Sequence, residues 1–210
     1  MTKREDLEKF KAEIQAHFPL RNLIYQPILH PAFKDWKTSR PSEATLNLIL
    51  KSCGDIKGRK ILDIGCCIGY YSHMMAKMGA NVTGIEIKSK RYEFCRYLSK
   101  LYGLGEDNPQ FINVDVANFA KSNKGKYDLI LLLSTVHWLF KQRGEEAWTI
   151  MRKISEWTGN MYLTYDKGFA HGFSPEKCLD KTLFKRVENL GFPKSRARGQ
   201  QRSIYLFRKN

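Results

Sequence analysis

The chain has 210 residues, of which 42% are hydrophobic and 27% charged, and its formal net charge is +15. That length favours one domain at residues 42–210, preceded by an N-terminal helix and a lid-like extension at residues 1–41. No apolar run reaches the roughly 18 residues of a membrane span, and residues 1–14 lack the apolar core of a signal peptide. With five cysteines and no C-x-x-C spacing, the composition predicts a cytoplasmic protein without a metal site.

The excess of positive charge has two explanations that the sequence leaves open. It favours an anionic partner such as RNA, a phosphorylated glycan or a lipid headgroup, or it belongs to a lysine-rich surface that keeps the chain soluble. Many of the basic residues gather before residue 41 and near the C-terminus: Lys34, Lys37, Arg40, Lys185, Arg186, Lys194, Arg196, Arg198, Arg202 and Arg208. We therefore predict a basic rim that a polyanionic molecule contacts.

The first forty residues predict an amphipathic helix followed by an irregular segment. Leu7, Phe10 and Ile14 recur at helical spacing within residues 2–17. Residues 19–41 contain several prolines together with many aromatic and basic side chains, which is typical of a functional loop rather than of a disordered one. We interpret this segment as a lid over a site, or as a strap whose aromatic rings fill the edge of the core. A helix then begins at proline 41 and ends at glycine 54.

A glycine-rich turn follows the first predicted strand. The stretch KILDIGCCIGYYS, residues 60–72, starts with an apolar run, breaks it at Asp63, and places Gly65 and Gly69 two and six residues later. Beyond Gly69 the apolar residues recur every three to four positions, as in a helix. Strand, glycine turn and helix together predict a place where a ligand approaches the backbone closely.

The second strand, residues 82–87, has Glu86 near its end, roughly 20 residues after the glycine turn. A carboxylate in that position accepts hydrogen bonds from a ribose diol. The dinucleotide fingerprint G-x-G-x-x-G is not met, because Cys67 and Tyr70 occupy its second and third glycine positions. An NAD(P)-dependent oxidoreductase therefore remains the less favoured enzyme reading.

The remaining elements alternate between helices and strands, which predicts a mostly parallel sheet. A helix spans residues 89–102, and an acidic residue, Asp115, lies near the end of a third strand at residues 111–116. The most hydrophobic run, residues 127–133, predicts the central strand. The later predictions are a helix at 141–157, a strand at 161–165, a helix at 175–190 and an edge strand at 202–208.

The motif D-x-G-x-x-x-G at residues 63–69, with Glu86 and Asp115 at the ends of the next two strands, resembles the class I S-adenosylmethionine (SAM) dependent methyltransferases. The resemblance implies an α/β protein with a three-layer αβα Rossmann-like methyltransferase fold, whose seven-stranded sheet is mostly parallel with an antiparallel last strand. Cys67 departs from the glycine that the family has at this position. SAM is the implied cofactor, and the implied cofactor-binding residues are Arg40, Asp63, Gly65, Cys66, Cys67, Gly69, Glu86, Ile87, Asp115, Val116 and Ser134.

In that family the second acid, here Glu86, binds the ribose, and the acid matched by Asp115 meets the adenine amino group. The amide of Val116 then faces the ring, Ser134 lies beside the sulfonium, and Arg40 pairs with the cofactor carboxylate. A general base is needed only when the acceptor must lose a proton. His137 is the candidate catalytic residue, since an imidazole ordinarily titrates near neutral pH, although a histidine in a turn also makes ordinary hydrogen bonds.

Missing motifs narrow the range of methyl acceptors that the sequence allows. No N-P-P-Y or D-P-P-Y follows the central strand, as in enzymes that methylate exocyclic base amines, and no Pro-Cys is present there. The segments LLLSTVHWL and GEEAW resemble methyltransferases that act on glycan or lipid-linked substrates, or on the terminal phosphate of RNA. We expect methyl transfer to an oxygen or nitrogen of an anionic acceptor; a catalytically inactive RNA-binding subunit with the same fold is the alternative.

Overall fold

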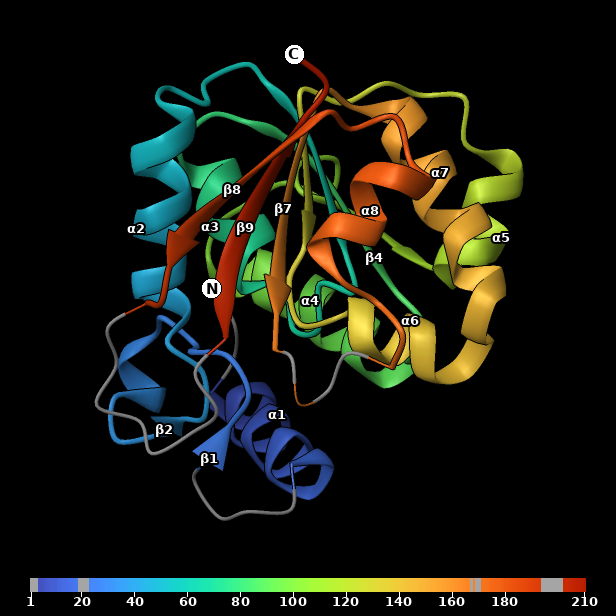
Figure 1. The fold of residues 1–210 in the computed structure, drawn as a ribbon. Coiled ribbons are helices and arrows are strands. Elements are labelled where there is room, and N and C mark those ends of the chain that lie inside the picture. Colours follow the sequence, from blue (N-terminus) through green and yellow to red (C-terminus); the bar gives the residue numbers. More distant parts are fainter. Residues whose placement is uncertain (1–3, 19–22, 167, 169–170, 194–201) are drawn as a thin grey trace.

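The structure is a computed structural model, and it describes residues 4–18, 23–166, 168, 171–193 and 202–210. Its centre is a seven-stranded sheet in the order β5-β4-β3-β6-β7-β9-β8 (Figure 1). The strands are β3 Lys60–Ile64, β4 Asn81–Glu86, β5 Gln110–Asn113, β6 Leu129–Leu132, β7 Asn160–Tyr165, β8 Arg186–Gly191 and β9 Ser203–Arg208. Only β9 runs antiparallel to its neighbours, so the predicted Rossmann-like methyltransferase fold is confirmed.

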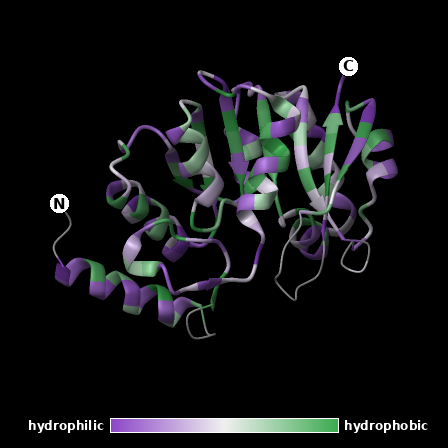
Figure 2. Ribbon diagram, turned by 90° about the vertical axis from the view of Figure 1, so that its left-hand side faces the viewer, coloured by the Kyte–Doolittle hydropathy of each residue, from purple (hydrophilic) through white to green (hydrophobic). Residues whose placement is uncertain are grey.

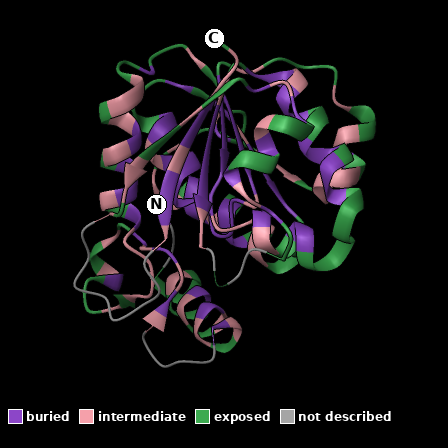
Figure 3. Ribbon diagram, in the orientation of Figure 1, coloured by how far each residue is buried: buried purple, intermediate pink, exposed green. Residues whose placement is uncertain are grey.

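Helices cover both faces of the sheet because side chains alternate along its strands. Within β3, Ile61 packs against the face covered by α2 and α3, whereas Leu62 packs against the opposite face, where α6, α7 and α8 lie. Figure 3 shows the buried strands enclosed between two helical layers with exposed outer surfaces. The helices are α2 Ser42–Cys53, α3 Tyr70–Lys77, α4 Ser89–Leu101, α5 Val116–Ser122, α6 Val136–Arg143, α7 Ala147–Trp157 and α8 Pro175–Lys181. None of the helices in the described part of the chain has the length and apolar character of a bilayer-spanning segment.

The N-terminal segment packs onto the domain through a separate apolar cluster. Its elements are α1 Arg4–His17, β1 Leu23–Ile24, a 3-10 turn at Pro31–Phe33 and β2 Lys37–Thr38, with β1 and β2 paired in parallel. Phe10 of α1 stacks on Tyr97 of α4 at 3.9 Å between ring centroids and meets Phe94 edge-on. Figure 1 places these elements beyond the end of the sheet toward which β7 points, and Figure 2 shows hydrophilic and hydrophobic residues interspersed along α1.

Two predicted elements near the C-terminus are wrong. The helix expected at 175–190 stops at Lys181, because Thr182 takes an extended backbone conformation, and the second half of that range forms β8. The strand at 202–208 is not an edge strand: β9 lies between β7 and β8 and buries Ile204 and Leu206 completely or nearly so. Phe184, Val187 and Leu190 recur every three positions, which favours a helix, and in β8 Val187 and Leu190 accordingly pack against opposite faces of the sheet.

Three other predicted elements have different bounds. The helix expected at 141–157 is two helices, α6 and α7, since Gly144 takes a left-handed φ of 52° at the break. The strand expected at 111–116 ends at Asn113, because Asp115 instead caps α5, a helix that the sequence pattern did not reveal. The central strand is β6, and Tyr127 contributes only an isolated bridge to Thr158.

Candidate active site

The glycine turn connects β3 to α3 at the carboxyl end of the sheet. Its first amides are tied to the neighbouring strand, since the N–H groups of Gly65 and Cys66 both donate to the Ile85 carbonyl oxygen, at 2.9 and 3.1 Å. Gly65 has a φ of 71°, and a Cβ there would lie 2.5 Å from Thr135 Oγ1. Thr135 Oγ1 in turn donates to the Ile64 carbonyl, also at 3.1 Å. Only glycine therefore allows the turn to pack this closely against the end of β6.

Cys67, which replaces a family glycine, keeps a glycine-like backbone. Its φ is 60°, a left-handed conformation that L-residues other than glycine seldom adopt. The thiols of Cys66 and Cys67 are buried, and Cys95 Sγ lies 4.0 Å from Cys66 Sγ and donates to the Cys67 carbonyl. Burial raises the pKa of the Cys67 thiol to about 12. These thiols are packing groups, so the turn presents backbone rather than cysteine chemistry.

Glu86 is held rigidly at the end of β4. Its side chain is 4% exposed, its Oε2 accepts from the Cys67 N–H at 3.0 Å, and its Oε1 accepts from the Lys88 N–H at 2.9 Å. A carboxylate offers about four acceptor positions, so both oxygens retain capacity for hydroxyl donors. The next residue, Ile87, was also predicted to bind the cofactor, but unlike Glu86 it has an exposed side chain, at 56%.

Asp63 is a buried carboxyl group at the end of β3. Only 2% of it is exposed, and Ser72 Oγ donates to its Oδ2 at 2.7 Å. Burial, reinforced by the charge of Glu86, raises the pKa of Asp63 to about 7, against the lowering effect of the Ser72 hydrogen bond. A cation placed beside Asp63 favours its ionised form, which makes this residue a suitable neighbour for the positive charges of SAM.

Asp115 lies close to Glu86 but is engaged as a helix cap. Its Oδ1 accepts from the N–H groups of Ala117 and Asn118, at 2.8 and 3.0 Å, and Arg143 Nη2 lies 3.8 Å away. The connection between strand ends is short, since the Val114 N–H donates to the Glu86 carbonyl at 3.2 Å. Val116 is the first residue of α5, and first-turn amides have no partner within a helix. Their roles toward adenine remain predictions.

Ser134 and His137 follow β6, as the sequence predicts. Ser134 takes a left-handed φ of 56° and donates its N–H to Thr164 Oγ1 on β7. His137 lies in the first turn of α6. Burial, followed by the nearby charges of Arg202 and Arg40, lowers the pKa of His137 to about 4. In this environment the pKa of the imidazole lies below the neutral range that the sequence analysis expected, and the catalytic role of His137 stays a prediction.

Two arginines converge beside His137, and only one of them was predicted as a site residue. Arg40 precedes α2, and its guanidinium lies 5.1 Å above the Tyr25 ring. Arg202 immediately precedes β9 and interacts with Arg40, Tyr25 and Asp166. Arg40 Nε, Arg202 Nε and Arg202 Nη1 are buried without a hydrogen-bond partner among the described residues. The sequence signal for Arg202 was its place in a basic segment, which did not distinguish it from its basic neighbours.

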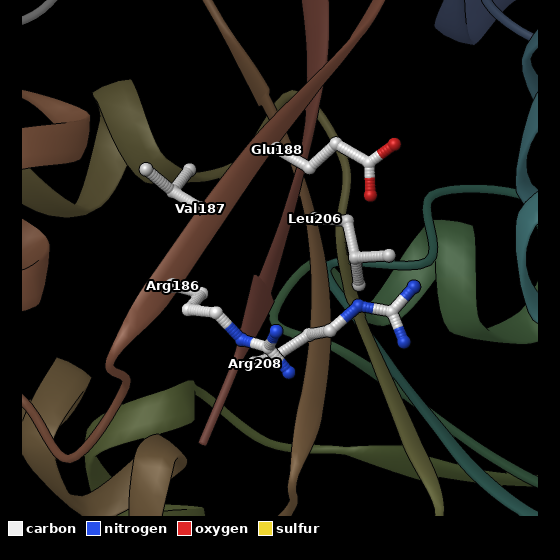
Figure 4. A pocket seen from close by; sticks show the side chains of 5 residues that line it. All are labelled: Arg186, Val187, Glu188, Leu206 and Arg208. Carbon is white, nitrogen blue, oxygen red and sulfur yellow. The ribbon is translucent and has the colours of Figure 1, made fainter. Parts of the chain in front are cut away.

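Three further predicted members of the basic rim, Lys185, Arg186 and Arg208, lie away from this site. Arg186 and Arg208 are cross-strand partners where β8 begins and β9 ends, opposite the edge that carries Glu86. They line a hollow of about 410 Å³ together with Val187, Glu188 and Leu206, and Figure 4 shows their side chains next to each other. Lys185 adjoins them and donates its N–H to the Arg208 carbonyl. Lys194, Arg196 and Arg198 lie outside the described residues.

The site defines the class of protein. A sequence model of the family described as "Methyltransferase domain" matches residues 61–159, the range that contains the glycine turn and all three strand-end acids. Combined with the strand order, this match identifies residues 61–159 as belonging to a class I SAM-dependent methyltransferase domain. The buried carboxylates fit SAM as the cofactor, since they supply acceptors for its hydroxyls and a counter-charge for its cationic end.

Particular relatives share this domain. The O-antigen chain terminator bifunctional methyltransferase/kinase WbdD of Escherichia coli is 27% identical over 187 residues, which are 78% of this chain and 25% of that protein. The ubiquinone biosynthesis O-methyltransferase of Photorhabdus laumondii is 30% identical over 128 residues, 60% of this chain and 47% of that protein. The chain thus spans between a quarter and a half of the length of these curated relatives.

Solved structures show the same fold. A WbdD structure with the kinase inhibitor LY294002 superimposes with a TM-score of 0.79 at 20% identity, covering 95% of this chain and 47% of that one. The magnesium protoporphyrin IX methyltransferase of Synechocystis PCC 6803 with bound SAM gives a TM-score of 0.62 at 22% identity, covering 80% of this chain and 79% of that one. At these identities the likeness concerns the fold alone.

Proposed function

We propose that this chain transfers the methyl group of SAM to an oxygen of an anionic acceptor. The observation that supports this most is the combination of a SAM-type strand-end site, formed around Asp63 and Glu86, with two half-buried arginines whose buried donor atoms lack partners among the described residues. The carboxylates suit the cofactor, which carries positive charge, and the arginines suit an acceptor that carries negative charge. The two kinds of ligand are thereby separated by charge within one site.

SAM, when bound, supplies a methyl group that is already activated by its sulfonium. The protein therefore contributes mainly alignment and the exclusion of water. Glu86 is proposed to accept hydrogen bonds from the ribose, with Asp63 near the cationic end, and Asp115 and the Val116 amide toward the adenine. The pairing of Arg40 with the cofactor carboxylate stays a prediction. The alternative is that Arg40 contacts the methyl acceptor.

The state of His137 favours an acceptor that is already deprotonated. A histidine whose pKa is about 4 is neutral at physiological pH but is a weak proton acceptor. An alcohol or an amine cation must lose a proton during methyl transfer, whereas an oxyanion such as a phosphate does not. We therefore favour an oxyanion over a neutral hydroxyl or amine, and give His137 a positioning role beside it rather than that of a general base.

Between the two anionic acceptors, we favour a phosphorylated glycan over RNA. A bound RNA strand requires a basic track that follows many phosphates, but Lys185, Arg186 and Arg208 lie at the opposite end of the sheet from Glu86. A single anionic group needs only the local charge that Arg40 and Arg202 supply. The similarity to an O-antigen chain terminator agrees with a glycan acceptor.

SAM binding is the first test. Calorimetric titration of SAM into the Glu86→Gln variant is expected to show a loss of about 1–3 kcal/mol in binding free energy, the usual range for a lost charged hydrogen-bond partner. Glu188→Gln is the matched control, because Glu188 is an exposed residue of β8 on the far strand of the sheet. Equal SAM affinity in the folded Glu86→Gln variant and the wild type would contradict the site assignment.

Turnover is the second test. Tritiated SAM should label a phosphorylated glycan fraction in preference to the same fraction treated with phosphatase. Labelling that is indifferent to phosphatase would mean that the accepting group is not a phosphate. SAM binding with no labelling of glycan or RNA would instead favour the catalytically inactive alternative.

A further inference from the structure

We propose that Arg40 and Arg202 together form a subsite that binds one dianionic phosphate group, the phosphate monoester of the methyl acceptor. The inference rests on the proposed function, because it specifies the acceptor of the same site. It starts from an arrangement that the fold does not need for stability. Two cationic side chains, 162 positions apart in the chain, are brought together in a partly buried place.

The charges around the pair are unbalanced. Burial and the charge of Arg40 both lower the pKa of Arg202, which is the expected response of a cation held near a second cation. Asp166 is the acidic side chain that interacts with Arg202, and its Oδ1 already accepts from the Gly168 N–H at 2.9 Å. Among the described residues, one carboxylate acting on Arg202 does not balance the charges of both Arg202 and Arg40, and an anionic ligand would neutralise the remaining positive charge.

The unused donors match a tetrahedral oxyanion. Three buried N–H groups, Arg40 Nε with Arg202 Nε and Nη1, have no acceptor among the described residues. A buried donor without a partner costs free energy, so an arrangement with three of them indicates a missing acceptor. A phosphate monoester has three terminal oxygens and about two negative charges, which match three donors and two guanidinium groups. A carboxylate offers two oxygens and one charge.

Aromatic and histidine groups complete the surroundings. The Tyr25 ring supports the guanidinium of Arg40 and its hydroxyl interacts with Arg202, so both arginines are held in place by one residue of the N-terminal segment. His137 faces the same place, and the charged or titratable groups that act on it are Arg202, Arg40, His171 and Asp166. When a bound anion neutralises the arginines, their lowering effect on the pKa of His137 falls. His137 thus provides a local reporter of occupancy.

Binding of inorganic phosphate tests the subsite directly. Phosphate is titrated calorimetrically into the full chain at constant ionic strength, since surface charges are screened by salt, with sulfate and acetate as comparison anions. We expect phosphate and sulfate to bind more tightly than acetate. Arg202→Gln should weaken phosphate binding about tenfold or more, as expected for a lost bidentate, charge-assisted contact. Arg208→Gln, which removes the same charge from the other end of β9, should bind phosphate as the wild type does.

Two further measurements keep the result interpretable. Arg202→Lys preserves the charge but not the planar donor fork, and it should bind phosphate more weakly than the wild type while retaining the fold, as checked by circular dichroism. NMR titration of the His137 imidazole, assigned with a His137→Gln variant, should show a higher midpoint with phosphate present. That rise should be absent in Arg202→Gln.

SAM affinity separates a failure of this inference from a failure of the proposed function. If Arg202→Gln loses phosphate binding and keeps SAM affinity, the subsite belongs to the acceptor as proposed. If the variant loses SAM affinity while the wild type shows no preference for phosphate over acetate, the arginines bind the cofactor carboxylate and the inference is overturned. Equal phosphate binding by the wild type, Arg202→Gln and Arg208→Gln also overturns it, although SAM binding and methyl transfer would still support the proposed function.

Discussion

The Asp63→Asn variant should be more stable than the wild type at alkaline pH and should bind SAM more weakly. Asp63 is buried, and its pKa in the folded protein is raised from 3.8 to about 7. A group whose pKa is higher in the folded state contributes its full stabilisation below the unfolded value. That contribution is lost as the pH rises from about 4 through 7. Asparagine resembles the protonated form, so it avoids this loss and keeps an oxygen that accepts from Ser72 Oγ.

The size of the effect follows from the shift. About three pKa units, at roughly 1.4 kcal/mol each, correspond to about 4 kcal/mol between the protonated and ionised forms. Above pH 8 the D63N variant should therefore exceed the wild type by up to about 4 kcal/mol in free energy of unfolding, whereas near pH 4 the two should differ little. For SAM the sign reverses, because the cationic ligand stabilises the carboxylate that the empty fold disfavours.

Urea denaturation of both proteins at several pH values between 4.5 and 8.5 measures the difference in their free energies of unfolding. Contributions from the titratable groups that both proteins share cancel in this difference. Asp55→Asn, a change at an exposed aspartate, is the control. Calorimetry in two buffers of different ionisation enthalpy should also detect a proton released when SAM binds near pH 6.5. A D63N variant that is less stable than the wild type at pH 8.5, with parallel pH profiles, would refute the reasoning.

Two backbone predictions concern the glycine turn. Gly65→Ala should destabilise the fold by more than Gly58→Ala in urea denaturation. Both glycines have a φ above 70°, but a Cβ at Gly65 meets Thr135 Oγ1 whereas a Cβ at Gly58 meets nothing within 4 Å; equal losses would show that the contact is unimportant. Cys67→Gly should stay within about 1 kcal/mol of the wild type, because the relief of a left-handed φ offsets lost packing and added chain entropy. Cys67→Val should be at least about 1–2 kcal/mol less stable than Cys67→Gly, and the reverse order would contradict a strained turn.

The fold was predictable where residues near in sequence determine the structure. The apolar runs of β3, β4 and β6, each followed by a polar or glycine residue, predict buried parallel strands with a site at their carboxyl ends. The strand-end acids Asp63 and Glu86 were found in the same way. The C-terminal region was not, because Val187 and Leu190 have the three-residue spacing of a helix, although in β8 they lie on opposite faces of the sheet. Pairing with β9, which depends on distant residues, overrides this local pattern.

Features that depend on distant segments escaped the sequence analysis for a related reason. Nothing local distinguishes Arg202 from Arg208, yet the first is placed against Arg40 and Tyr25 and the second against Arg186 at the other end of the same strand. The low pKa of His137 depends on those same neighbours, so a motif-based expectation of a general base could not anticipate it. The environment of each charged side chain, and therefore its pKa, is set only when the sheet brings the start of β9 and the segment before α2 together.

The same long-range placement bears on how acceptor and cofactor are told apart. Asp63 and Glu86 come from β3 and β4, whereas Arg202 immediately precedes β9, which lies two strands beyond β6 in the sheet. Opposite charges in contact would form an internal ion pair and satisfy each other, but within the described residues neither carboxylate has an arginine as a hydrogen-bond partner. The carboxylates accept from backbone and hydroxyl donors, while three guanidinium N–H groups have no partner among the described residues. We therefore propose that the cationic cofactor meets the carboxylates and the anionic acceptor meets the arginines, and that like-charge repulsion disfavours an exchange of their places.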